Sequence, residues 1–267
     1  MTTFQKVIKY LAIAFAAFLA VSIIGGILGA AGIFSGISCE DVLLDEPRNI
    51  SISNNITSLN VDIAAAEITI KKSDTFTIES NLKHLDVIEN DRELIIKEDS
   101  KYGIGYTDAF LTINLPDETV FETAKISSGA GRVSVDILSA DSLKLEFGAG
   151  EININSLCAN KNAKINGGAG KITISNGRLN NLDLDMGVGQ LDLSGSVYGN
   201  SDFDLGVGKS NFTFTGYEDD YSIDIEKGLG SISVNGKQVT EYHSVSGNNR
   251  IEIEGGMGAI NLVFKTK

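Results

Sequence analysis

Apolar and polar residues alternate along most of the chain after residue 50, and short glycine turns interrupt the alternation at regular intervals. In the segment LKLEFGAGEININ, which starts at Leu143, every second residue before and after the Gly-Ala-Gly turn is apolar, and the residues between them are charged or amide residues. A period of two is that of a β-strand with one face against a core. The pattern therefore predicts a strand, a turn and a second strand in each repeat.

This turn recurs through the second half of the chain. Seven Gly-x-Gly triplets are spaced by 19, 20, 19, 19, 22 and 28 residues. Their first glycines are Gly129, Gly148, Gly168, Gly187, Gly206, Gly228 and Gly256. Repeats of this length stack as coils that each contact only their neighbours. We therefore predict an all-β fold, a parallel β-solenoid of the β-helix or β-roll kind, with coils of about 19 residues.

Two apolar columns would line the inside of such a solenoid. The column before the turn consists of Ile126, Leu145, Ile165, Leu184, Phe203, Ile225 and Ile253. The column after the turn consists of Val135, Ile154, Ile174, Leu193, Phe212, Val234 and Leu262. The residue between the two glycines is small or apolar in every repeat. We expect its side chain to point inward, at a corner whose backbone angles only glycine adopts easily.

The chain before the regular repeats is less uniform. Residues 59–70 resemble a coil in which alanines replace the glycines, and residues 76–115 contain four short segments that alternate like strands. We expect an irregular, partly antiparallel portion over 51–120 and regular coils over 121–265. Residues 236–249 are predicted to be a loop that extends the sixth coil.

The N-terminal segment predicts a membrane anchor. Thirty consecutive residues, from Tyr10 to Cys39, carry no charge, and about 20 apolar residues are enough to cross a bilayer. We predict a transmembrane helix over 10–38. Two lysines precede this segment and four acidic residues follow it closely, so the positive-inside rule places residues 1–9 in the cytoplasm.

The rest of the chain would then lie outside the cell membrane. We predict a linker over 39–50 and a single extracytoplasmic domain over 51–267. Two alternatives stay open for the N-terminal segment, which are a cleaved signal peptide and lipid attachment at Cys39.

Charge and the scarcity of reactive residues narrow the function. Only two of the 22 basic residues precede Cys39, and none of the 35 acidic residues does, so 20 basic and 35 acidic residues give the remainder a net charge of −15. Such a domain is a poor partner for nucleic acid. The only cysteines are Cys39 and Cys158, and the only histidines are His84 and His243. No spacing among these four residues predicts a disulfide framework, a metal site or a catalytic nucleophile, and we expect no cofactor.

One outward pattern stands out when equivalent positions are compared between repeats. Lysines occupy the position four residues before the turn at Lys125, Lys144 and Lys164. The last four repeats carry carboxylates four and two residues before the turn, at Asp183, Asp185, Asp202, Asp204, Asp224, Glu226, Glu252 and Glu254. Neighbouring coils lie about 4.8 Å apart, and at this distance two like charges repel by about 0.9 kcal/mol in water. This acidic ladder is either a solvated face or a binding surface for a cationic partner or divalent cations.

The layout resembles a bacterial family known as the putative adhesins with β-strand repeats, a domain of unknown function. The segment FLTINLPDETVFETAKISSGAGRVSVDIL (110–138) and the Gly-x-Gly coils after it carry the resemblance. The resemblance implies a cell-surface solenoid, often behind one N-terminal helix, with no established catalytic residues to transfer to this chain.

These observations favour a non-enzymatic, membrane-anchored scaffold of the cell surface, adhesin-like or envelope-sensing, whose partner is an unknown surface protein or polymer. One alternative is an enzyme that acts on cell-wall or extracellular polysaccharide. It would use an acidic pair such as Asp183 and Asp202, although the nearest candidates for an aromatic platform, Tyr198, Tyr217 and Tyr221, suggest loop packing. A second alternative is self-assembly through open strand edges at the ends of the solenoid.

Overall fold

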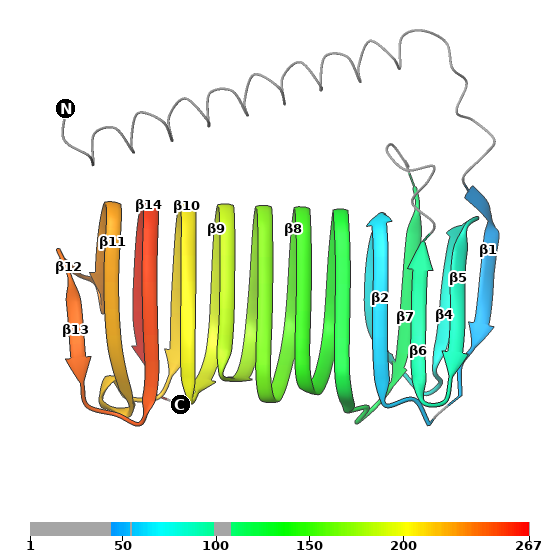
Figure 1. Ribbon diagram of the computed structural model, residues 1–267, viewed down its shortest axis with the longest axis horizontal. Helices are drawn as coiled ribbons and strands as arrows, with labels where there is room; N and C mark the ends of the chain where they lie inside the picture. The colour runs from blue at the N-terminus through cyan, green and yellow to red at the C-terminus, as the bar shows by residue number, and fades with distance from the viewer. Residues whose placement is uncertain (1–43, 54, 99–107, 267) are drawn as a thin grey trace, which may run out of the picture. The chain divides into compact units, whose positions relative to one another are not determined.

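The computed structural model describes residues 44–53, 55–98 and 108–266, and over these residues the fold is all-β, as predicted (Figure 1). The strands form one 14-stranded sheet that winds around a continuous apolar core. A short 3-10 helix, η2 (Glu218–Asp220), is the only helical segment in this part of the chain.

No helix within the described residues is long and apolar enough to cross a membrane. The predicted cytoplasmic tail (1–9), the predicted transmembrane helix (10–38) and Cys39 lie outside the described residues.

The regular coils are formed by β8 (Phe121–Asn180), β9 (Leu182–Tyr198), β10 (Asn200–Thr215), β11 (Tyr221–Val234) and β14 (Asn249–Lys265). Strand β8 continues for 60 residues because pairing with the neighbouring coils does not stop at the glycine turns. The coils pair in parallel and in register. Every member of the two predicted inward columns is buried. The glycine turns follow one edge of the coils, at the top of Figure 1, and the polar loops follow the opposite edge.

The order of the last coils in space differs from their order in the sequence. Strand β14 pairs with β10 on one side and with β11 on the other, so the sheet order is β9, β10, β14, β11. We expected coils to stack in chain order, which was wrong here. The physical reason lies in residues 235–248, which fold back on the outer side of β11 and leave only its inner side open for the final strand.

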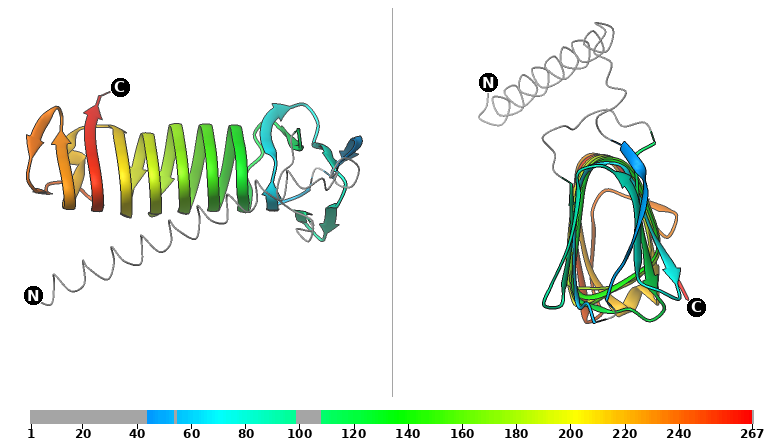
Figure 2. Two further views of the ribbon diagram at one scale, coloured as in Figure 1. Left: turned by 90° about the horizontal axis from the view of Figure 1, so that it is seen from above. Right: turned by 90° about the vertical axis from the view of Figure 1, so that its right-hand side faces the viewer.

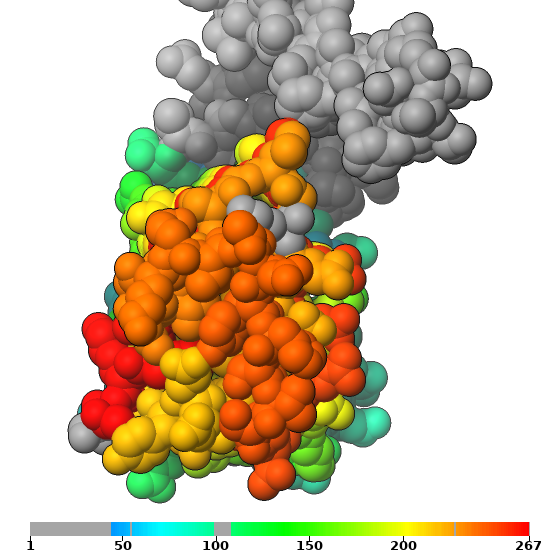
Figure 3. Space-filling view, turned by 90° about the vertical axis from the view of Figure 1, so that its left-hand side faces the viewer, coloured from blue at the N-terminus to red at the C-terminus, as the bar shows by residue number. Residues whose placement is uncertain are grey.

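Two short strands cover the outer side of β11. They are β12 (Lys237–Val239) and β13 (Tyr242–Val245), and both pair antiparallel with β11. The segment 236–249, predicted as a loop, therefore contains two strands and caps this end of the stack, as the orange surface in Figure 3 shows. The core beneath the cap is aromatic, and Tyr221 stacks on Phe214 and packs against Phe264.

The other end of the stack is partly antiparallel, as predicted. Strands β2 (Ser58–Ala65) and β3 (Glu67–Ser73) form the alanine-containing coil and pair in parallel with β8. Strands β4 (Thr77–Leu82), β5 (Leu85–Asn90), β6 (Glu93–Glu98) and β7 (Phe110–Pro116) correspond to the four predicted segments. Strand β4 pairs antiparallel with β7, and β5 pairs antiparallel with β6.

The predicted linker over 39–50 needs a correction. Residues from Leu44 onward form β1 (Leu44–Ser51), which pairs antiparallel with β4. Seven of the eight residues in β1 are exposed, so this strand lacks the alternation of apolar and polar residues on which the prediction of strands depended. Backbone pairing at the edge of the sheet holds it in place instead.

The glycine turns require glycine because neighbouring coils lie very close together there. At Gly208 the backbone has φ of +145°, and a Cβ added there would lie 1.8 Å from the carbonyl oxygen of Gly189 in the next coil. The residue between the glycines points outward rather than inward, contrary to our expectation, and Val188 and Val207 are 49% and 40% exposed. The inside of the corner is already filled by the residue before the first glycine, such as Met186 or Leu205, which is buried.

Candidate functional site

The eight predicted carboxylates lie in two columns, and backbone pairing brings them into register from coil to coil. The column farther from the turn, which we call the outer column, has the spatial order Asp183, Asp202, Glu252 and Asp224. The column nearer to the turn, the inner column, has the order Asp185, Asp204, Glu254 and Glu226. The predicted alignment is therefore present, with the last two coils exchanged.

Basic groups lie beside three of the four carboxylates in the outer column, all except Asp202. The Lys164 Nζ atom lies 2.6 Å from a carboxylate oxygen of Asp183, and Arg250 Nη2 lies 2.7 Å from Glu252. His243 places its Nδ1 atom 3.6 Å from Asp224, so it adds a positive charge there when it is protonated. Sequence reasoning missed Arg250 and His243. Arg250 precedes Glu252 by two residues in one strand, which could have revealed it, whereas His243 reaches Asp224 only through the unpredicted strand β13.

The inner column keeps its negative charge. Asp185 lies 3.8 Å from Lys164, but no described basic side chain forms an ion pair with Asp204, Glu254 or Glu226. Partial burial, together with the hydrogen bond that a protonated Asp204 carboxyl donates to Asp185 and the negative charges around it, raises the pKa of Asp204 above its ordinary value. Three carboxylates beside the glycine turns, together with Asp202 of the outer column, therefore lack an ion-pair partner among the described side chains.

The same column is balanced in the earlier coils. Glu146 accepts hydrogen bonds from Lys144, at 2.8 Å, and from the Ser127 hydroxyl, at 3.0 Å, and Lys125 lies 3.6 Å away. These partners, Lys144 first among them, hold the pKa of Glu146 below its ordinary value. The predicted lysines Lys125 and Lys144 thus neutralise this column at Glu146, whereas the same column in the last four coils has fewer basic partners.

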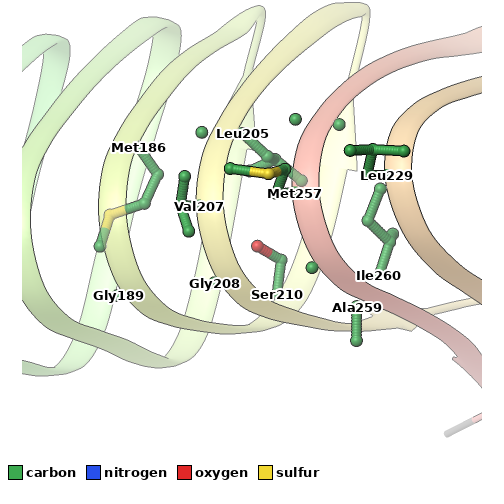
Figure 4. A pocket seen from close by; sticks show the side chains of 14 residues that line it. Met186, Gly189, Leu205, Val207, Gly208, Ser210, Leu229, Met257, Ala259 and Ile260 are labelled. Carbon is green, nitrogen blue, oxygen red and sulfur yellow. The ribbon is translucent and has the colours of Figure 1, made fainter. Parts of the chain in front are cut away.

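The outward residues of the last glycine turns form a line of exposed apolar side chains that we call the corner ridge. Its members, in spatial order, are Val188, Val207, Met257 and Leu229. Their exposed fractions are 49%, 40%, 50% and 73%. Figure 4 shows Met257 between Val207 and Leu229, and next to it the buried Leu205. The equivalent residues of the earlier coils are the smaller Ala130, Ala149 and Ala169.

An open depression lies beside the corner ridge, and we call it the glycine groove. Its floor is the backbone of Gly187, Gly206 and Gly256, and its wall is formed by Asp185, Asp204 and Glu254 of the inner column. A small cavity of about 20 Å³ lies next to it, lined by Leu205, Ile260 and members of the corner ridge. Such a volume is close to that of one water-sized probe. The glycines leave backbone exposed, so this edge of the molecule offers carboxylates, bare backbone and apolar side chains in parallel lines.

The other candidates from the sequence are metal-ligating side chains, Cys158 and Tyr221. Among the described residues, no three His, Cys, Asp or Glu side chains group closely enough to hold a metal ion. The binding of divalent cations stays a prediction. Cys158 is a free, partly buried thiol whose Sγ atom lies 3.5 Å from Asn160. Tyr221 is buried, and this burial raises its pKa to about 12.

The fold defines a class of protein, an all-β chain of stacked Gly-x-Gly coils. Its glycine turns carry the corner ridge and the glycine groove along one edge. The chain belongs to the Toastrack DUF4097 family, whose model matches residues 56–266. The predicted resemblance to an adhesin-like domain family is thereby confirmed. A search of curated proteins finds no match.

Several solved structures are similar to the chain over most of its length. A "putative cell adhesion protein" from Clostridium sporogenes is 16% identical, with a TM-score of 0.35, and the match covers 82% of this chain and 99% of that one. A "putative adhesin" from Bacteroides fragilis is 14% identical, with a TM-score of 0.45 and coverage of 85% and 100%. A "putative lipid binding protein" from Parabacteroides distasonis is 14% identical, with a TM-score of 0.41 and coverage of 81% and 96%.

Proposed function

We propose that this chain is a non-enzymatic scaffold of the cell envelope, anchored in the membrane by residues 10–38, whose coiled domain binds a surface partner. The observation that carries the proposal is the turn edge of the last four coils. There, exposed apolar side chains are aligned in register with carboxylates, and three of these carboxylates have no ion-pair partner among the described side chains. A contiguous apolar patch with a polar border is typical of an interaction site.

The anchor supports the same proposal. Thirty residues without charge precede the described domain, and the charges around them favour an extracytoplasmic location for that domain. The net charge of −15 after residue 38 would keep the domain away from anionic lipid and favour cationic or neutral partners.

Cell fractionation and protease protection test the anchoring. Cells that produce the full-length chain are separated into membrane and soluble fractions, and intact cells are treated with an external protease. We expect the chain in the membrane fraction and the coiled domain accessible from outside. Recovery in the cytosol, or protection of the coiled domain in intact cells with a permeable outer layer, would refute the proposal.

A second candidate function is action on an extracellular polysaccharide, and one observation favours it. A polar depression on the loop edge is lined by Tyr198, Asp219, Asp220, Asn248 and Asn249. Tyr198 is 40% exposed there, and aromatic and carboxylate groups together are suited to sugars. Release of reducing ends from peptidoglycan or an acidic polysaccharide by the purified full-length chain, lost in Asp219→Asn, would favour this candidate over the scaffold.

A further inference from the structure

The corner ridge, the glycine groove and the inner acidic column run parallel along four consecutive coils. Backbone pairing connects Val188 to Val207, Val207 to Met257, and Met257 to Leu229, and it connects the inner-column carboxylates in the same order. A partner that lies along this edge would therefore meet the same chemical pattern four times in succession.

The spacing of the coils decides which kind of backbone fits along the ridge. Neighbouring coils are about 4.8 Å apart. Successive turns of an α-helix are about 5.4 Å apart, whereas side chains on one face of an extended strand are about 6.7 Å apart. Over the three steps from Val188 to Leu229, the accumulated mismatch is about 2 Å for a helix and about 6 Å for a strand. A helix of about ten residues covers the ridge, which is about 14 Å long.

Charge sets the composition of that helix. On one side of the ridge lie Asp204 and Glu254, which have no ion-pair partner among the described side chains. Burial first, and then the neighbouring carboxylates Asp185, Asp183 and Asp202, raise the pKa of Asp204. On the other side of the ridge, the residues that follow the second glycine are Gln190, Lys209, Ala259 and Ser231, none of which is acidic. A bound cation would gain energy on one side only.

We infer that the turn edge binds an amphipathic α-helix of a partner protein, with the helix axis parallel to the stack. Its apolar stripe covers Val207, Met257 and Leu229, and lysine or arginine side chains along one edge of that stripe reach Asp204 and Glu254 across the glycine groove. This inference rests on the proposed scaffold function and names the chemistry of the partner. Helix-in-groove recognition commonly uses apolar anchors at i, i+3 and i+7, with charged residues beside them.

A synthetic peptide tests the inference directly. The probe is a helical peptide of about 14 residues with a leucine stripe and four lysines along one edge of that stripe. The control peptide has the same composition, with the four lysines on the opposite face. Binding to the full-length protein in a mild detergent is measured by fluorescence anisotropy. We expect the probe to bind at least about tenfold more tightly than the control, which corresponds to about 1.4 kcal/mol.

Variants locate the site. We expect Met257→Ser with Leu229→Ser to weaken the probe at least about tenfold, and Asp204→Asn with Glu254→Gln to weaken it by a similar factor and to reduce its dependence on salt. Matched controls are Ile88→Ser, which removes an exposed apolar side chain from β5, and Asp136→Asn, which removes an exposed carboxylate from β8. Both controls should leave binding within about twofold.

Several outcomes would overturn the inference. These are no binding of the probe at millimolar concentration, equal binding of the two peptides, and equal losses in the site variants and the control variants. Binding of vesicles with anionic headgroups through the same ridge residues would replace the helix with a membrane surface. Dimerisation in sedimentation that Leu229→Ser abolishes would replace it with a second copy of the chain. If the chain is found in the membrane and is accessible from outside but the probe does not bind, the proposed scaffold function stands and only the helix-binding site is rejected.

Discussion

Replacing the second glycine of a turn by alanine should damage this fold far more than a change of one methyl group normally would. Gly208 faces two separate obstacles. Its φ of +145° lies in a region that is almost closed to residues with a Cβ, at a cost of about 1–3 kcal/mol. The new Cβ would also lie 1.8 Å from the Gly189 carbonyl oxygen, whereas ordinary contact begins at 3.4 Å.

The cost of the close contact can be estimated from the backbone hydrogen bonds that it would break. The two coils would have to separate locally by about 1.6 Å, the difference between those distances. A displacement of this size breaks backbone hydrogen bonds between the coils, each worth about 1 kcal/mol net. With two bonds lost, the total cost of Gly208→Ala is about 3–5 kcal/mol. Domains have a total stability of about 5–15 kcal/mol, so this one change would remove a large part of it.

Substitutions at two other glycines test the backbone angle and the close contact separately. Gly206 has no positive φ, but its added Cβ would lie 2.1 Å from the Gly187 carbonyl oxygen, so Gly206→Ala tests the contact alone and should cost about 2 kcal/mol. Gly236 has φ of +78° and no atom within 4 Å of an added Cβ. Gly236→Ala therefore tests the backbone alone and should cost about 1 kcal/mol.

Guanidinium unfolding of the full-length chain in detergent, followed by far-UV circular dichroism, measures all three variants. The expected order of destabilisation is Gly208, Gly206, Gly236. Equal losses for Gly208→Ala and Gly236→Ala would refute the idea that contact between coils imposes glycine. If the free energy of unfolding depended less steeply on guanidinium concentration, at an unchanged midpoint, only the coils near the substitution would be opening.

Three further predictions concern other parts of the stack. The pKa of Asp204 is higher in the folded than in the unfolded state, so its negative charge destabilises the native state at pH 7, and this effect disappears as the pH falls towards about 4. Asp204→Asn should therefore raise the melting temperature at pH 7 but not near pH 4. The control Asp136→Asn should not raise the melting temperature at either pH. Asn211 donates to Asp192 at 2.6 Å and accepts from Asn261 at 2.9 Å, so Asn211→Ala should cost about 1–2 kcal/mol in denaturant unfolding and Thr213→Ala much less. A chain that stops after Asn248 lacks β14, so hydrogen exchange should show less protection in β10, and in β11 protection only where it pairs with β12 and β13, while β2 keeps its protection.

The period-two alternation was sufficient to predict the coils, their parallel pairing and the residues that fill them. Each inward residue, such as Ile165 or Leu184, must be apolar to join one continuous core, and that requirement is visible in the sequence. The order of β14 and β11 is not visible in the same way. The longer steps of 22 and 28 residues indicate an irregularity, but apolar columns fit equally well on either side of a neighbouring coil.

The candidate site was predicted only in part. The carboxylate columns follow directly from the register. Which of those charges stays free depends on Arg250 and on His243, and the position of His243 depends on a strand that the sequence does not mark. The corner ridge was missed because a turn with small and apolar residues at its centre usually buries them. Here Met186 and Leu205 already occupy the inside of the corner, so Val188 and Val207 face solvent.

The exchanged position of β14 has a consequence for how the fold is completed. Most coils can join the stack as soon as the next 19 or so residues emerge. Strand β14, however, pairs with residues about 50 positions earlier in the chain, and β11 has no coil to pair with on its inner side until β14 arrives. Closing the longer loop costs additional entropy and slows assembly. The last strand therefore joins β11 to the rest of the stack, and a chain interrupted before residue 249 would leave both β10 and β11 with an open edge.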